Sequence, residues 1–336
     1  MIDRRSLLAA TAAVAALPGA ARARQTGWSA RADLPWVTQE IYAAGLDQKI
    51  WTAGGLVARP GGMHINDRTA VYDPASDSWT EGPRLPQPRH HPMLVGAEGR
   101  VWAFGGYDRR DGGDWTAMTD VWATDRGVWA QVGQMPSRLC ETVGLGIGDR
   151  IHLVSGRSPI GDANGEWTDQ GDVDSHLVFI ASENRWETAR PIPMARNSAA
   201  GAVLDGKLWV AGGRTVQGGG TGRLDRYDPQ TDAWDTLAPI PASTTGQQVG
   251  GGLAMAALDG KLVAFGGEWF VRGGGGVFSE TWIYDPVADA WDRGPDMLTP
   301  RHGLAAVEAG GVIFAIAGGR LVSGGAATAT LEAFSL

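Results

Sequence analysis

The sequence predicts an all-β protein in which six similar antiparallel sheets close into a ring. Three observations predict this fold class. A glycine pair recurs at near-constant spacing, an aromatic residue with tryptophan seven positions later follows each of the first five pairs, and the last unit lacks its tryptophan. The 336 residues include 50 Gly and 15 Trp, which fits many short packed strands joined by tight turns.

Each repeat contains a β-branched or aromatic run that ends in the glycine pair. Successive second glycines lie 51, 50, 57, 54 and 52 residues apart, and self-similarity at such a period indicates a repeat architecture. Glycine at this point permits positive φ or a close approach of another backbone. With Ser155-Gly156 as a degenerate member, the pairs are Gly54-Gly55, Gly105-Gly106, Ser155-Gly156, Gly212-Gly213, Gly266-Gly267 and Gly318-Gly319.

A second strand pair follows each loop. Three repeats carry Tyr-Asp-Pro and a turn before the tryptophan, and Asp and Pro are turn formers, so two strands joined by a tight reverse turn are expected. The aromatic residue and its tryptophan are Tyr72/Trp79, Trp122/Trp129, Phe179/Trp186, Tyr227/Trp234 and Tyr284/Trp291.

The sixth repeat predicts how the ring closes. Phe334 matches the tyrosine position, but its tryptophan would fall beyond Leu336, whereas Trp28 has no glycine pair before it. The strand around Trp28 is therefore expected to complete the sheet that ends at Leu336, which leaves no long edge bare.

This pattern resembles the Kelch repeat over Arg24–Leu336. The resemblance implies a six-bladed β-propeller with four antiparallel strands in each blade. It also implies that the glycines end the second strand, that the tyrosine lies on the third strand and that the tryptophan begins the outer fourth strand.

The N-terminal segment reads as an export signal over residues 1–23. Arg4 and Arg5 precede a short apolar stretch from Leu7 to Leu17, and Ala21-Arg22-Ala23 offers a cleavage site. The paired arginines favour a twin-arginine signal over an ordinary secretory one. The domain over 24–336 is then expected in the periplasm or secreted, without a membrane span after signal removal.

Charge and cysteine content exclude several classes of protein. The net charge is −8 and no basic run appears, so no nucleic-acid partner is expected. Cys140 is the single cysteine, so no internal disulfide can form. A monomer is expected.

Two sets of positions are candidates for the mouth of the central channel. Residues directly after the glycines form one set, and the starts of the innermost strands form the other. Guanidinium groups match carboxylates bidentately, so the arginines predict a site for a small acidic saccharide or an acidic protein partner. For the second set, the alternative is that the arginines bond backbone carbonyls of the neighbouring blade. The candidate ligand-binding residues are Arg157, Arg214, Arg320, Tyr107, Arg89, Arg138, Arg196, Arg301 and His302.

Glu268 breaks the repeat, because it is an acid where three other repeats carry arginine after the glycines. The chain resembles the periplasmic Kelch sialic-acid epimerases (mutarotases) in its export signal and in its six-bladed architecture. That resemblance implies Glu268 and Arg272 as catalytic residues. Anomer interconversion requires only an acid–base relay and positioning, so no cofactor is expected. A purely structural scaffold for protein partners is the remaining alternative.

Metal chemistry is not expected. His90 and His91 are adjacent and would point to opposite faces of a strand. A galactose-oxidase-type copper site needs a tyrosine crosslinked to cysteine, and Cys140 has no evident partner for it. The repeat does not explain four aromatic residues, which suit stacking on sugar faces or anchoring of loops: Trp115, Trp167, Trp269 and Phe270.

Overall fold

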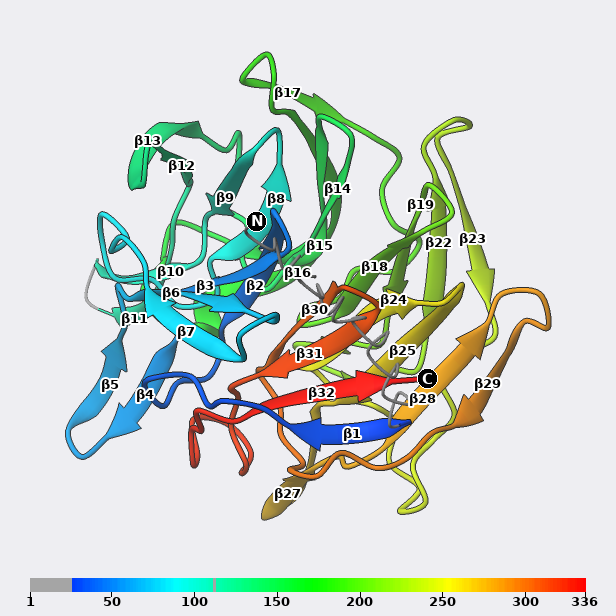
Figure 1. Ribbon diagram of the computed structural model, residues 1–336. Coiled ribbons are helices and arrows are strands. Elements are labelled where there is room, and N and C mark those ends of the chain that lie inside the picture. Colours follow the sequence, from blue (N-terminus) through cyan, green and yellow to red (C-terminus); the bar gives the residue numbers. More distant parts are fainter. Residues whose placement is uncertain (1–25, 111–112) are drawn as a thin grey trace, which may run out of the picture.

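The computed structural model describes residues 26–110 and 113–336. Six four-stranded antiparallel sheets surround a central axis and form a six-bladed β-propeller (Figure 1). The predicted fold class is confirmed. The export signal predicted for residues 1–23 lies outside the described residues. No helix in the described part of the chain has the length and apolar character needed to cross a membrane.

The strands of each blade follow the chain from the axis outward. The first three blades are β2 (Tyr42–Leu46), β3 (Lys49–Ala53), β6 (Thr69–Asp73) and β7 (Ser78–Glu81); β8 (Met93–Ala97), β9 (Arg100–Phe104), β12 (Asp120–Asp125) and β13 (Val128–Gln134); and β14 (Val143–Ile147), β15 (Arg150–Pro159), β16 (Gln170–Ile180) and β17 (Arg185–Thr188).

The last three blades repeat this plan, except that the sixth takes its outer strand from the N-terminus. They are β18 (Ala200–Leu204), β19 (Lys207–Ala211), β22 (Leu224–Asp228) and β23 (Ala233–Leu237); β24 (Leu253–Leu258), β25 (Lys261–Gly266), β28 (Thr281–Asp285) and β29 (Ala290–Arg293); and β30 (Ala305–Ala309), β31 (Val312–Ile316), β32 (Leu331–Ser335) and β1 (Gly27–Ala30).

The ring closes as predicted. Strand β1 pairs with β32, and Trp28 lies opposite Phe334 in the register. The Trp28 indole is buried, and its Nε1 donates to Thr281 Oγ1 at 2.9 Å, so the closing strand also holds blade 5.

The repeated aromatic residues tie neighbouring blades together. The Tyr284 hydroxyl donates to Asp289 in the turn at 2.6 Å, while Trp291 Nε1 donates to the carbonyl of Ala238 in the preceding blade at 2.8 Å. Other blades make equivalent bonds, such as Trp234 Nε1 to the Arg190 carbonyl. The tyrosine therefore orders its own turn, and the tryptophan fixes the spacing between sheets.

Short hairpins follow the glycine pairs and gather on one side of the propeller. In blades 1, 2, 4 and 5 they are β4 (Leu56–Arg59) with β5 (Gly62–Ile65), β10 (Tyr107–Arg110) with β11 (Gly113–Ala117), β20 (Arg214–Thr215) with β21 (Gly219–Gly220), and β26 (Glu268–Val271) with β27 (Gly274–Val277). In blade 3 the long strands β15 and β16 extend in the same way.

Candidate functional site

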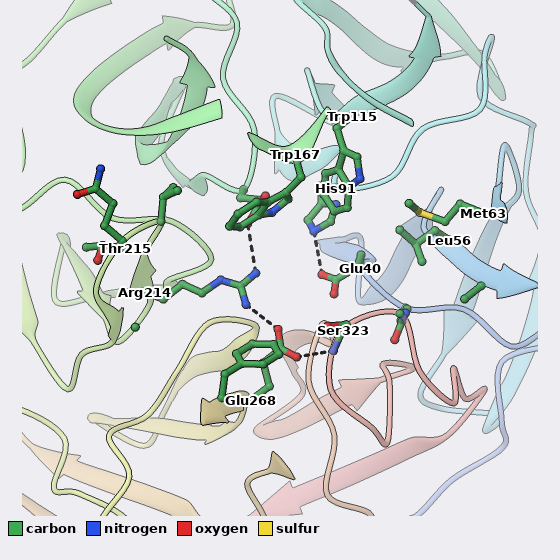
Figure 2. Close-up of a pocket in the computed structure, with 18 residues that line it drawn as sticks. Glu40, Leu56, Met63, His91, Trp115, Trp167, Arg214, Thr215, Glu268 and Ser323 are labelled. Atoms are coloured by element: carbon green, nitrogen blue, oxygen red, sulfur yellow. Dashed lines mark hydrogen bonds and ion pairs between the residues drawn. The ribbon is translucent and has the colours of Figure 1, made fainter. Parts of the chain in front are cut away.

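A cavity of about 590 Å³ lies at the mouth that these hairpins surround (Figure 2). Its size is that of a typical small-molecule site. The side chains of Arg214 and Glu40 point toward one another across it. Its remaining wall is partly aromatic and apolar, with Trp115, Trp167, Phe270, Leu56, Ala58 and Met63 among the lining residues.

A ring of six equivalent residues, one per blade, forms at the start of the innermost strands. Each has a left-handed backbone, with φ between 47° and 70°. Each also lies fifteen residues before the second member of the left-handed residue pair that ends the second strand of its blade. Five backbone hydrogen bonds run from N–H to carbonyl between neighbouring members, including His91 to Glu40 and Gly303 to Gly252. The ring consists of Glu40, His91, Glu141, Ser198, Gly252 and Gly303.

The residue types in this ring differ between the blades. Three consecutive blades supply ionisable side chains, Glu40, His91 and Glu141, whereas blades 5 and 6 supply glycine. A Cβ atom on Gly303 would lie 2.7 Å from the Glu40 carboxyl group. Glycine at this position therefore leaves the space that Glu40 occupies.

Glu268 enters the cavity from the position directly after a glycine pair. Arg214 Nη1 donates to Glu268 Oε1 at 2.6 Å, and the Ser323 backbone N–H donates to Oε2 at 2.8 Å. Only 3% of Glu268 is exposed. His302 Nδ1 lies 3.5 Å from the same carboxylate.

Glu141 lies behind Arg214 and is buried. It accepts hydrogen bonds from Tyr107 Oη at 3.1 Å, Arg157 Nη1 at 3.2 Å and Ser198 Oγ at 2.5 Å. Burial by itself would raise the pKa of Glu141, but the charges of His91, Arg157 and Arg214 lower that pKa below its ordinary value. Glu141 is thus ionised at neutral pH.

Glu40 is the third carboxylate. His91 Nε2 lies 2.8 Å from its Oε2, and His302 Nδ1 lies 3.6 Å from its Oε1. Burial would raise the pKa of Glu40, but the charge of His91 and its hydrogen bond outweigh burial and lower the pKa to about 2.

Three predicted ligand-binding arginines, Arg89, Arg196 and Arg301, do not line the cavity. Their side chains are fully buried beside carboxylates of their own blades, where they pair with Asp120, Asp225 and Glu332. Arg301 also donates to the carbonyls of Thr299, Ala315 and Ala317. Arg196 and Arg301 do bond backbone carbonyls, but these carbonyls belong to their own blades and not to the neighbouring ones. The expected position at the mouth was wrong for all three.

Arg138, Arg320 and Arg272 are exposed and also lie outside the cavity lining. In blade 3 Leu139 occupies the arginine position, one residue after Arg138. In blade 6 the two left-handed residues are Ala317 and Gly318, with φ of 56° and 105°. Gly319, and not Arg320, therefore follows the pair. Arg272 lies in the turn between β26 and β27.

Arg157, Tyr107 and His302 support the cavity from behind its wall. Arg157 also stacks on Trp167, with its guanidinium carbon 4.0 Å from the ring centroid. His302 Nε2 donates to the Leu321 carbonyl at 2.9 Å. Of the nine predicted ligand-binding residues, Arg214 alone is among the lining residues.

Sequence reasoning missed Gln39, Glu40 and Glu141. The constant fifteen-residue spacing to the glycine pair is the signal that finds Glu40, His91 and Glu141 as equivalent positions. The expected arginine-rich mouth was wrong, because three carboxylates and a single arginine line the cavity. Among the described residues, no group of three or more His, Cys, Asp or Glu is arranged to hold a metal ion.

Comparison with known proteins agrees with this architecture. A family model described as the Kelch motif matches residues 195–241 and 250–298, within blades 4 and 5. The Kelch-like protein terF of Aspergillus terreus is 24% identical over 303 residues, which cover 88% of this chain and 64% of that protein. The human Kelch-like protein 34 is 30% identical over 173 residues, 51% of this chain and 25% of that protein.

A solved structure titled "Structure of YjhT" superimposes with a TM-score of 0.75 at 16% identity, covering 92% of this chain and 98% of that one. The chain spans less than two thirds of the length of the two Kelch-like relatives. The fold is a six-bladed β-propeller with a cavity of mixed polar and apolar lining at one mouth. The chain carries Kelch motifs in blades 4 and 5, and it resembles Kelch-like proteins over most of its length.

Proposed function

We propose that the mouth cavity binds a small carbohydrate. The observation that carries the proposal is the pair of opposed polar groups, Arg214 and Glu40, set among the rings of Trp115, Trp167 and Phe270. Carboxylate and guanidinium groups bond sugar hydroxyls, and aromatic faces pack on the C–H faces of a sugar ring. The sequence pointed to an acidic saccharide, but Arg214 is already paired with Glu268. We therefore expect the site to recognise the hydroxyl groups of a sugar and not a carboxylate.

Calorimetric titration of the purified protein with a panel of monosaccharides tests this function. We expect saturable binding that Arg214→Gln weakens by at least about tenfold, because a hydrogen bond from a charged group is worth about 1.5–3 kcal/mol. Arg185→Gln is the matched control, since Arg185 is exposed on β17 and bonds the nearby Glu183 and Glu187. Absence of binding to every sugar, or equal affinities in both variants, would reject the proposal.

A second candidate is a cofactor-free epimerase or mutarotase. A specific observation favours it: Glu268 faces the cavity with both carboxylate oxygens fixed, one by Arg214 and the other by the Ser323 N–H. A carboxylate held in this way is suited to proton transfer with a sugar hydroxyl. Arg272, which the resemblance pairs with Glu268, is exposed on the hairpin turn, so Arg214 takes the partner role in this proposal.

Exchange spectroscopy between sugar anomers separates the two candidates. An enzyme raises the exchange rate of its sugar, and Glu268→Gln abolishes that increase. A protein that binds the sugar without changing the exchange rate is a binding module.

We further propose that the protein is exported by its N-terminal signal and acts as a monomer. The paired Arg4 and Arg5 support export. Replacing both by lysine should stop export through the twin-arginine route, and secretion that survives the change would count against that route. A protein partner is the alternative occupant of the mouth, because Phe270 and Val271 on its rim are half-exposed.

A further inference from the structure

Three hydrogen-bonding contacts link a backbone carbonyl to the cavity through two buried histidines. His90 Nε2 lies 2.8 Å from the Asp114 carbonyl oxygen. His90 Nδ1 lies 2.8 Å from His91 Nδ1. His91 Nε2 lies 2.8 Å from Glu40 Oε2. Both rings are buried, so leaving one of these contacts unmade would cost free energy.

The chain needs more protons than two neutral imidazoles supply. The carbonyl only accepts, so His90 Nε2 must carry a proton. One proton must lie between the two Nδ1 atoms, and one must lie between His91 Nε2 and the carboxylate. Each neutral imidazole carries one ring proton. Three contacts therefore require one proton beyond the two that the neutral rings provide.

The surroundings place the positive charge on His91. Its ring is the one beside the Glu40 carboxylate, whereas burial and the neighbouring charge of His91 lower the pKa of His90 to about 3. Aromatic rings also lie near His91. The groups that face it are Glu40, His90, Glu141, Tyr42, Tyr107 and Trp115.

With this proton, three cations match the three carboxylates of the cavity. His91 lies beside Glu40, Arg157 lies beside Glu141, and Arg214 lies between Glu268 and Glu141. We propose that the His90–His91–Glu40 chain holds one extra proton, centred on His91, and that the resulting match of charges selects an uncharged polyhydroxylated ligand. The ligand part of this proposal rests on the proposed carbohydrate site. The position of the proton does not.

Nitrogen-15 NMR of histidine-labelled full-length protein tests the proton directly. Near neutral pH, we expect both ring nitrogens of His91 to carry protons and His90 to be neutral with its proton on Nε2. His91→Gln assigns the signals, and His64→Gln is the control because His64 is exposed on β5. A singly protonated His91, whether the extra proton is then on His90 or on Glu40, would overturn the proposal.

Ligand charge gives a second test. Glucose, glucuronate and glucosamine share one ring and differ in net charge. We expect the unsubstituted protein to bind glucose best. We also expect His91→Gln, which leaves Glu40 without a cation, to shift the preference toward glucosamine over glucuronate by at least about tenfold. An unchanged preference would overturn the charge argument. If no sugar binds the unsubstituted protein, the proposed function fails, while the NMR measurement still decides where the proton lies.

Discussion

Arg214 Nη1 donates to Glu268 Oε1 at 2.6 Å across the boundary between blades 4 and 5. The two residues occupy the same repeat position, directly after a glycine pair, in successive blades. A change of residue type between equivalent positions has therefore produced an ion pair at the rim of the cavity. In a propeller, neighbouring repeats place equivalent side chains side by side, so variation along one repeat position builds a site.

This ion pair should couple the two residues in stability. Glu268→Gln leaves Arg214 with one fewer anion, and breaking a buried pair costs about 3–5 kcal/mol. We expect the double variant with Arg214→Gln to lose less than the sum of the two single losses. Denaturant unfolding of all four proteins measures the coupling, and additive losses would show that the pair contributes no interaction of its own.

Gly303 should be intolerant of a side chain for two separable reasons. Its φ is 57°, and a Cβ atom there would lie 2.7 Å from the Glu40 carboxyl group. Gly206 is the matched control, with φ of 68° and open space around its Cβ position. Gly206→Ala should cost about 1 kcal/mol for left-handed backbone alone. Gly303→Ala should cost clearly more and should weaken ligand binding, and equal unfolding free energies of the two variants would contradict the crowding at Glu40.

A buried histidine pair should make the protein sensitive to acid. His152 Nδ1 donates to His176 Nε2 at 2.8 Å, because His176 Nδ1 donates to the Arg190 carbonyl. Burial lowers the pKa of His152 to about 3 and that of His176 to about 4, from an ordinary value of 6.5. The unfolded chain therefore takes up protons first, so this contribution to stability is complete above pH 6.5 and falls as the pH drops toward 3.

His152→Gln keeps a donor toward His176 but cannot itself titrate. Its free energy of unfolding should fall less steeply between pH 6.5 and 4 than that of the unsubstituted protein. His64→Gln, at an exposed site, should leave the pH profile unchanged. Parallel profiles for His152→Gln and the unsubstituted protein would mean that other groups cause the acid sensitivity.

Removal of the closing tryptophan should destabilise the ring. Trp28 is 6% exposed, packs on Phe265 and Phe334, and bonds Thr281. Trp28→Ala should cost about 3–5 kcal/mol, as other buried Trp truncations do. Val287→Ala, at a residue that is 97% exposed, should change stability by no more than about 0.5 kcal/mol. Chemical denaturation compares the two, and a small loss for Trp28→Ala would show that β1 is dispensable for closure.

The fold was predictable from the sequence, because the residues that build it act locally and recur in every repeat. Glycine pairs end strands through left-handed backbone, Tyr284 orders its turn, and Trp291 bonds the preceding blade. The missing tryptophan after Phe334 and the unmatched Trp28 predicted the closing strand. Two of the residues that the sequence singled out directly after glycine pairs, Glu268 and Arg214, line the cavity.

The tertiary structure alone decided which other side chains reach the cavity. A displacement of one residue from the repeat position decides exposure: Arg138 lies one residue before its position and Arg320 one residue after, and both are exposed, whereas Glu141 lines the cavity. Arg196 is held inside its blade by Asp225, a residue on a different strand. Glu40 fits because Gly303, more than 260 positions away in the sequence, has no side chain. Such contacts depend on neighbouring blades and on the closure of the ring, and no single repeat contains them.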